Sequence, residues 1–346
     1  MGHRYARCLV MAGGGFRFGY YLGLHAALAA QGRAPDVLLA SCGGAIAAAI
    51  IQALPDAAAR RDWLASPAMH AFCHSLQARP GATLGGALAG ALARFCSRQP
   101  APRVPDLFND YLFELPAMLP MPTAPDPAPG PAVAFIAGTL LYGEHEVGQP
   151  RGARPLFAET VLCDTRTAAL LQGMRAPMDD PRWSHGVIAP DLRTVTDMPV
   201  ADAVRASIAD MFYFRCHTHA GQHYLGGAID LVPVEIARQL ADEVFMERKA
   251  PYDHTLAAPA LRAVLGIDGN RRMRHVMQPA DLHAHPGHHS VDTSDMRRAL
   301  PHALLRKHLR WAANRIELAA PEQLADYRRL VDAQWHYGHQ CGQRLA

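Results

Sequence analysis

Residues 37–44 read Val-Leu-Leu-Ala-Ser-Cys-Gly-Gly, and this short stretch decides the fold that we predict. An apolar run that passes through small residues into an alanine-rich segment is typical of a buried strand that turns sharply into a helix. Such a turn presents one side chain at its apex and needs tiny residues two positions to either side, because the strand and helix backbones nearly touch there. Ala40 and Gly44 meet that need around Cys42, which is therefore the predicted apex residue.

Cys42 is the candidate nucleophile of this turn. Ser41 is the alternative, but a turn centred on Ser41 would place Leu39 where a small residue is required. Cys42 would also stand at the N-terminus of a helix predicted over residues 43–53, whose dipole favours a thiolate and predicts a pKa below the reference value of about 8.5. A purely structural interpretation stays open, because free cysteines are among the residues most often buried.

A glycine run, Gly13 to Gly15, lies between the apolar segment of residues 8–11 and a helix predicted over residues 19–31. Backbone N–H groups left bare by glycines at a helix N-terminus can bind a phosphate or a developing oxyanion. No Gly-Lys-Ser/Thr follows the run, and the spacing does not match GxGxxG, so the pattern argues against a nucleotide site.

A further motif, His223-Tyr224-Leu225-Gly226-Gly227-Ala228-Ile229-Asp230, follows a segment predicted as a strand. Together with the glycine run and the turn at Cys42, it resembles the patatin-like phospholipase family of lipid acyl hydrolases, which use a Ser–Asp dyad. The resemblance implies that Cys42 stands at the serine position and Leu225 at the aspartate position. It also implies an oxyanion hole built by Gly13, Gly14, Gly15 and Arg17, with Phe18 where the family usually has glycine.

The general base is left open, because leucine cannot accept a proton. His223 is the preferred substitute, since alternate residues of a strand share a face and His223 would point the same way as Leu225. Asp230, Asp210 and His217 are weaker candidates. We expect Asp230 to cap its loop or to bind backbone amides.

Two functions fit these residues. In one, Cys42 forms an acyl-thioester and the protein is an acyl hydrolase or acyltransferase acting on lipid acyl esters or thioesters. In the other, the protein is a catalytically inactive pseudoenzyme that binds an acyl chain or a protein partner, as the changes at Leu225 and Phe18 favour. We expect no cofactor and no metal, and we interpret the histidine-rich residues 283–289 as a solvated loop.

The order strand, helix, strand, helix with short turns predicts an α/β sandwich with parallel pairing. The resemblance implies a patatin-like three-layer sandwich with a central, mostly parallel sheet. We expect this domain over residues 1–250, with residues 251–346 forming a helical C-terminal extension packed on it. Residues 294–343 in particular are predicted to be strongly helical.

The composition limits which partners and which cellular compartment we expect. Half of the 346 residues are hydrophobic and 19% are charged, which predicts a sizeable core, and a net charge of +3 argues against nucleic acid as a partner. The seven cysteines lack CxxC spacing, and no stretch has the roughly 18 to 20 apolar residues that span a bilayer. We therefore expect a cytoplasmic protein. The basic residues 297–315 could contact anionic lipid head groups at a membrane surface, or they could form only a solvent-exposed face.

Overall fold

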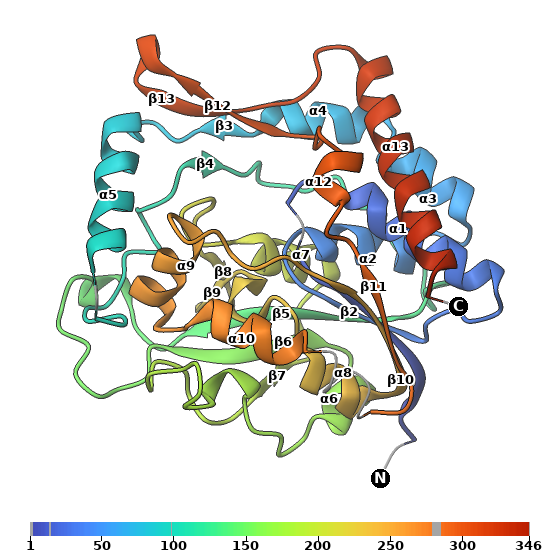
Figure 1. Ribbon diagram of the computed structural model, residues 1–346, viewed down its shortest axis with the longest axis horizontal. Coiled ribbons are helices and arrows are strands. Elements are labelled where there is room, and N and C mark those ends of the chain that lie inside the picture. The colour runs from blue at the N-terminus through green and yellow to red at the C-terminus, as the bar shows by residue number, and fades with distance from the viewer. Residues whose placement is uncertain (1–2, 14, 98, 279–284, 346) are drawn as a thin grey trace.

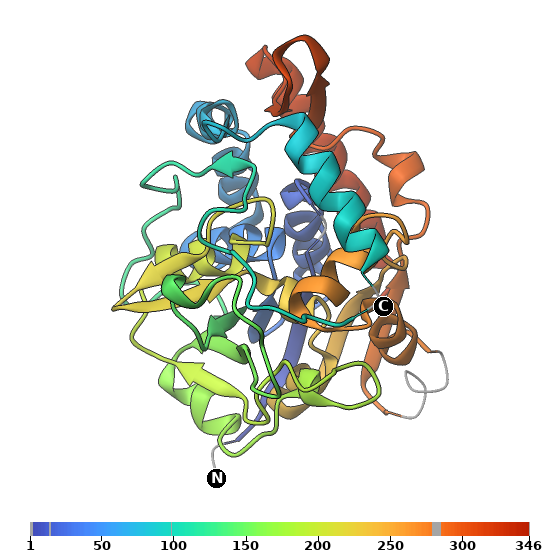
Figure 2. The same cartoon turned by 90° about the vertical axis from the view of Figure 1, so that its left-hand side faces the viewer.

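The computed structural model describes residues 3–13, 15–97, 99–278 and 285–345. At the centre of this part of the chain lies a nine-stranded, mixed sheet with helices on both faces (Figures 1 and 2). Its main path runs in the order β11-β10-β1-β2-β5-β6-β7. The strands of this path are β1 (Tyr5–Met11), β2 (Val37–Ala40), β5 (Ala132–Leu140), β6 (Phe157–Cys163), β7 (Arg193–Val195), β10 (Ala241–Arg248) and β11 (His288–Asp292).

Most neighbours in this sheet pair in parallel, as expected. Strand β1 pairs in parallel with both β2 and β10, and β2 does so with β5. The antiparallel pairs all lie on the other side of β5, where β6 and β9 (Gln222–Leu225) both pair with it. Strand β9 forms a hairpin with β8 (His217–His219).

Both faces of the sheet are covered by apolar side chains, because successive residues of a strand point to opposite faces. In β1, Leu9 and Met11 belong to one core and Cys8 and Val10 to the other. The first core also holds the helices that follow β1 and β2, and the second holds two helices that flank β10. These helices are α1 (Phe18–Ala30) and α2 (Gly43–Ala53) on the first face, and α8 (Val234–Leu240) and α10 (Gly269–Val276) on the second.

Residues 56–120 are only partly helical. Three helices form in the first two thirds of this segment, and the proline-rich remainder is mostly irregular. They are α3 (Ala57–Leu64), α4 (Pro67–Ser75) and α5 (Leu84–Cys96). Between α4 and α5, β3 (Gln77–Ala78) pairs with β4 (Phe113–Glu114). Later short helices are α6 (Thr165–Leu170), α9 (Ala257–Ala260) and α12 (Met296–Ala299). None of the helices in the described ranges has the length and apolar character needed to cross a bilayer.

The C-terminal part differs from the expected helical extension. Strand β11 pairs in parallel with β10, so residues on both sides of position 250 share the central sheet. The basic stretch predicted as a helix forms the antiparallel hairpin of β12 (Arg306–Arg310) and β13 (Arg315–Ala319), whose turn contains Asn314 in the left-handed conformation, with φ of 47°. That turn cannot continue a right-handed helix. Helix α13 (Leu324–Gln343) matches the helical prediction, and the short α12 is the other α-helix described within residues 294–343.

Helix α13 packs along α1, far from it in sequence (Figure 1). Two glycines permit the close approach: a side chain on Gly23 would overlap the carbonyl oxygen of Trp335, and one on Gly338 would overlap that of Tyr20. The helix that follows the glycine run is therefore held in place by the last described helix of the chain.

Candidate active site

Cys42 occupies the apex of a sharp turn between β2 and α2. Its backbone has φ 49° and ψ −122°, a strained conformation for a residue with a side chain and one that clusters at functional sites. A side chain on Gly44 would overlap the carbonyl oxygen of Met11, so only glycine fits there. Ser41, the alternative nucleophile, is fully buried and its hydroxyl donates to the carbonyl oxygen of Asp230 at 3.1 Å.

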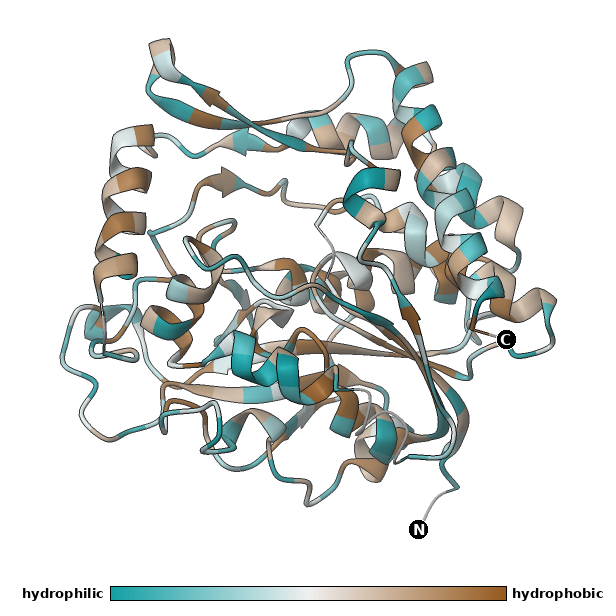
Figure 3. Cartoon of the chain, viewed as in Figure 1, coloured by the Kyte–Doolittle hydropathy of each residue, from teal (hydrophilic) through white to brown (hydrophobic). Residues whose placement is uncertain are grey.

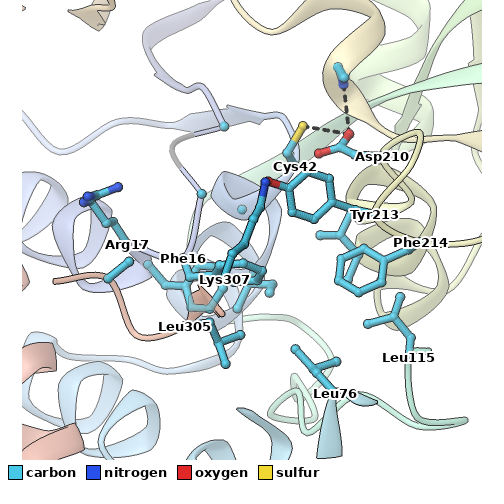
Figure 4. A pocket seen from close by; sticks show the side chains of 18 of the residues that line it. Phe16, Arg17, Cys42, Leu76, Leu115, Asp210, Tyr213, Phe214, Leu305 and Lys307 are labelled. Carbon is cyan, nitrogen blue, oxygen red and sulfur yellow. Dashed lines mark hydrogen bonds between the residues drawn. The ribbon is translucent and has the colours of Figure 1, made fainter. Parts of the chain in front are cut away.

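The partner of the Cys42 thiol is Asp210. The thiol donates to Oδ1 of Asp210 at 3.1 Å, and the same oxygen accepts the backbone N–H of Ala228 at 3.2 Å (Figure 4). Asp210 lies just after α7 (Val200–Ile208), and a side chain on Gly226 would overlap its carboxylate. The carboxylate thus lies over the first glycine of the Gly226–Gly227 pair, which directly follows Leu225.

Burial sets the protonation of this pair. Removal from water raises the pKa of Asp210 to about 6, and the hydrogen bonds from Cys42 and Ala228 oppose part of that rise. Burial also raises the pKa of the Cys42 thiol well above its usual range, and the neighbouring Asp210 charge adds to the rise. The expectation of a thiol pKa lowered by the dipole of α2 is therefore wrong, because desolvation and the carboxylate outweigh the helix terminus. At neutral pH the pair is a thiol facing a carboxylate.

Ser207 fixes the backbone of the turn. Its hydroxyl accepts the N–H of Cys42 at 3.1 Å and donates to the carbonyl oxygen of Ile136 at 2.8 Å. Because Ser207 and Asp210 both come from the end of α7, this one segment contacts the backbone and the side chain of Cys42.

His223, the base preferred from the sequence, is not brought to Cys42. Its Nδ1 lies 2.8 Å from the hydroxyl of Thr218, and its ring packs edge-on against Phe108 at 5.0 Å between centroids. The reason lies in Leu225, which is fully buried in the second core and packs on Gly138 of β5. The face that His223 was expected to share with Leu225 does not present its side chains to the thiol.

The glycine run lies against the nucleophile, as its predicted role requires. A Cβ on Gly13 would come within 2.8 Å of the Cys42 Cβ, and one on Gly43 within 2.6 Å of the Gly15 carbonyl oxygen. Gly14 lies outside the described residues. The carbonyl oxygen of Phe16 accepts from Leu304 N at 3.0 Å and from Gln334 Nε2 at 3.3 Å. Residues from the C-terminal part thus hold the end of this loop.

Arg17 and Phe18 line the wall beside the glycines. Arg17 donates to the carbonyl oxygen of Leu300 at 3.3 Å, and burial together with the charge of Arg297 lowers its pKa. Phe18 packs beneath Gly43 and leaves a cavity open in front of Cys42. The bulky Phe18 therefore forms part of the wall without filling the site.

The cavity in front of Cys42 has a volume of about 390 Å³, within the range of roughly 300–1,000 Å³ typical of ligand pockets. Its far wall is apolar and includes Leu76, Leu115 and Phe214 (Figure 4). On another side, Lys307 of β12 lies 4.3 Å over the ring of Tyr213. The site therefore combines an apolar chamber, a thiol–carboxylate pair and a cation.

Asp230 has the structural role that we expected. It accepts the backbone N–H of Val232 at 3.3 Å and forms an ion pair with Arg272 at 3.0 Å. Arg272 also pairs with Glu235 at 2.6 Å. These contacts fix the loop after the second motif and leave Asp230 no contact with the thiol among those described.

A protein-family sequence model matches most of the chain. The sequence model of the family described as patatin-like phospholipase matches residues 9–238, which include the glycine run, the Cys42 turn and the second motif. Among solved structures, VipD from Legionella pneumophila matches with 13% identity and a TM-score of 0.36, covering 99% of this chain and 68% of that one. The search of curated proteins gave no significant match.

Proposed function

Because the chain belongs to the patatin-like phospholipase family, a family of lipid acyl hydrolases, we propose that it is an acyl hydrolase or acyltransferase with Cys42 as its nucleophile and Asp210 as its general base. The observation that carries the proposal is the 3.1 Å hydrogen bond from the Cys42 thiol to the Asp210 carboxylate beside an apolar cavity. A thiol beside an ionised carboxylate is the arrangement that activates a nucleophile without a metal or a cofactor.

In the first half-reaction, Cys42 Sγ attacks the carbonyl carbon of an acyl ester or thioester while its proton passes to Asp210 Oδ1. The oxyanion that develops faces the glycine run, where backbone N–H groups stabilise it. When the tetrahedral intermediate collapses, the carbon–oxygen or carbon–sulfur bond breaks and the leaving group takes the proton from Asp210. An acyl-thioester then remains on Cys42.

In the second half-reaction, water or another acceptor hydroxyl gives its proton to Asp210 and attacks the acyl-thioester. The carbon–sulfur bond breaks, the proton returns to Cys42 Sγ, and the acid or the new ester leaves. With a pKa of about 6, the Asp210 carboxylate is ionised at neutral pH yet basic enough to accept a proton in each half-reaction.

The substrate is a lipid acyl ester or an acyl-thioester. The apolar wall of the cavity suits an acyl chain, and Lys307 offers an anionic leaving group, such as a phosphate-bearing head group, a favourable charge. Lys307→Glu should raise KM for an anionic acyl-thioester more than for a neutral ester, and equal effects on both would argue against this role.

An exposed surface beside the cavity supports a peripheral contact with anionic membranes. Helix α5, largely apolar in Figure 3, exposes Leu88, Leu92 and Phe95 along one stripe, with 52%, 63% and 52% of their surface accessible. The hairpin β12–β13 next to it exposes Trp311 to 69%, among exposed arginines. Asn314 joins the two elements by accepting from Leu84 N at 2.8 Å. Apolar side chains among basic ones are typical of interfacial binding.

Binding to vesicles tests this surface. We expect co-sedimentation with vesicles that contain phosphatidylserine and a marked loss of it in Trp311→Ala combined with Leu92→Ala. The control variant Leu256→Ala removes an exposed leucine outside this stripe and should bind as wild type. Binding that is unchanged in the double variant would refute the contact.

All seven cysteines are free thiols, which supports a reducing compartment, and we propose the cytoplasm.

Intact-mass analysis with an acyl-thioester probe tests the chemistry. The wild type should gain one acyl group, Cys42→Ala none, and Asp210→Asn only slowly. The six other cysteines serve as an internal control, since they should stay unmodified on the same timescale.

The alternative function, an inactive protein that binds an acyl chain, is favoured by one observation: the thiol is buried, and its pKa is raised rather than lowered. If no acyl adduct forms while wild type and Cys42→Ala bind a fatty acid equally, the protein is such a binding protein.

A further inference from the structure

We propose that Asp202, His217 and His219 form a binding site for a divalent transition metal such as Zn²⁺, at the base of the hairpin β8–β9 and separate from the active-site cavity. His217 and His219 alternate on β8 and so present their rings to the same side. Asp202, in the first turn of α7, faces both of them. The proposal does not depend on the function proposed above.

The distances in this cluster suit a metal site. His217 Nε2 lies 3.3 Å from Asp202 Oδ1, and His219 Nδ1 lies 3.6 Å from Asp202 Oδ2. One ligand atom from each residue can be chosen so that all lie within 4.8 Å of one another. With bonds of about 2.0–2.1 Å, tetrahedral zinc holds its ligand atoms about 3.3 Å apart, so small side-chain rotations bring the three into coordination.

The surroundings of His217 also favour a metal. Its Nε2 is buried and makes no hydrogen bond, although the Asp202 carboxylate is close enough for one. Arg205 is a nearby cation and opposes a second positive charge, but its guanidinium is directed to the carbonyl oxygens of Pro116 and Ala117.

The position of the cluster would couple metal binding to Asp210, the proposed general base of the active site. Helix α7 carries Asp202 near its start and Ser207 near its end, and Asp210 follows. Strand β8 pairs with β9, which leads into Gly226 beneath the Asp210 carboxylate. A metal held by α7 and β8 would therefore tie together the two segments that enclose Asp210. The three side chains stay between 12% and 39% exposed, so water can reach the metal and complete its coordination.

Cobalt absorption provides a direct test on the metal-free protein. Titration with Co²⁺ should give the visible bands of a tetrahedral site at one equivalent, and Zn²⁺ should displace them. The variants Asp202→Asn and His219→Ala should each weaken binding at least about tenfold, the lower bound for losing even an indirect contact to a metal. The matched control is His223→Ala, which removes a histidine of the same hairpin outside the cluster and should bind as wild type.

Thermal unfolding supplies a second readout and checks that the variants fold. Excess Zn²⁺ should raise the Tm of wild type and of His223→Ala, but not of Asp202→Asn or His219→Ala. Since histidines also occur at residues 283–289, binding that persists unchanged in both cluster variants would overturn the proposal. So would the absence of tetrahedral bands in the wild-type protein.

Discussion

The turn at residues 40–44 and the segment of residues 206–230 that faces it position the thiol–carboxylate pair in different ways. At the turn, small neighbours and a strained backbone fix the position of Cys42. Opposite it, Leu225 of β9 points into the second core, and Asp210 supplies the carboxylate from an adjacent loop. The turn tolerates little because its backbone is crowded, whereas a base needs only a carboxylate oxygen at the right point.

The largest effect that we expect comes from the carboxylate. Asp210→Asn should lower the rate of Cys42 acylation by about 10²- to 10⁴-fold, the usual contribution of a general base. His223→Ala is the control and should leave the rate within about twofold of wild type, because His223 bonds to Thr218 instead. Single-turnover acylation followed by mass spectrometry measures both. A loss in His223→Ala as large as in Asp210→Asn would indicate that His223 of β9 takes part as the general base.

The second test asks whether the two carboxylate positions are interchangeable. Leu225→Asp in the Asp210→Asn background should not restore acylation, because Leu225 points into the second core. It should also destabilise the fold by several kcal/mol, since it buries a carboxyl group among apolar side chains. Urea unfolding and acylation rates measure the two outcomes. Recovery of activity would show that position 225 can still reach the thiol.

A third effect is the pH dependence that Asp210 imposes. Because its carboxyl has a pKa of about 6 when folded and 3.8 in the ordinary state, the folded protein binds the proton more tightly. Rising pH between these values therefore lowers stability, by about 3 kcal/mol in full. Asp210→Asn should be more stable than wild type above pH about 6, and this advantage should vanish near pH 4.

Activity should follow the same ionisation in the opposite direction. In wild type, kcat/KM should rise with pH and level off above about 6, as Asp210 becomes able to accept a proton. Urea unfolding and rate profiles over pH 4 to 8 test both trends. A profile that rises only near the thiol range would mean that a free thiolate, and not the pair, is the nucleophile.

The smallest effect concerns the backbone of the turn. Ser207→Ala leaves the buried N–H of Cys42 and the carbonyl of Ile136 without their partner, which should cost about 1–3 kcal/mol of stability. Acylation should slow less than in Asp210→Asn, because the carboxylate stays. Ser207→Thr keeps the hydroxyl and is the matched control. Stability equal to wild type in the alanine variant would mean that α7 does not support the turn.

Local sequence patterns predicted the part of the site that depends on the local backbone. The helix after the turn was expected over residues 43–53 and has these bounds, because small residues and an apolar run leave few alternatives. The basic stretch of residues 297–315 was predicted as a helix and is mainly a hairpin, since its scattered leucines fit either period and the turn at Asn314 decides. Local patterns predict secondary structure least well where a single turn residue, here Asn314, reverses the chain.

Asp210 was only a weaker candidate for the general base, because no local sequence pattern distinguishes it. Its role arises from the contact of the loop after α7 with Gly226, which joins residues apart in sequence. One signal was available: because the resemblance places Leu225 at an aspartate position beside Gly226 and Gly227, a carboxylate in the segment that packs on those glycines is the natural substitute. The thiol pKa was misjudged for the same reason, since burial and Asp210 are both non-local.

The support of the glycine run by α13 has a consequence for how the protein is made. The carbonyl of Phe16 is held by Gln334, 318 residues later. A growing chain exposes the glycine run and the Cys42 turn early in synthesis, but it lacks this support until α13 has emerged and docked on α1. Acyl transfer would therefore begin only on the finished fold, so that a truncated or stalled chain carries a thiol without a working site around it.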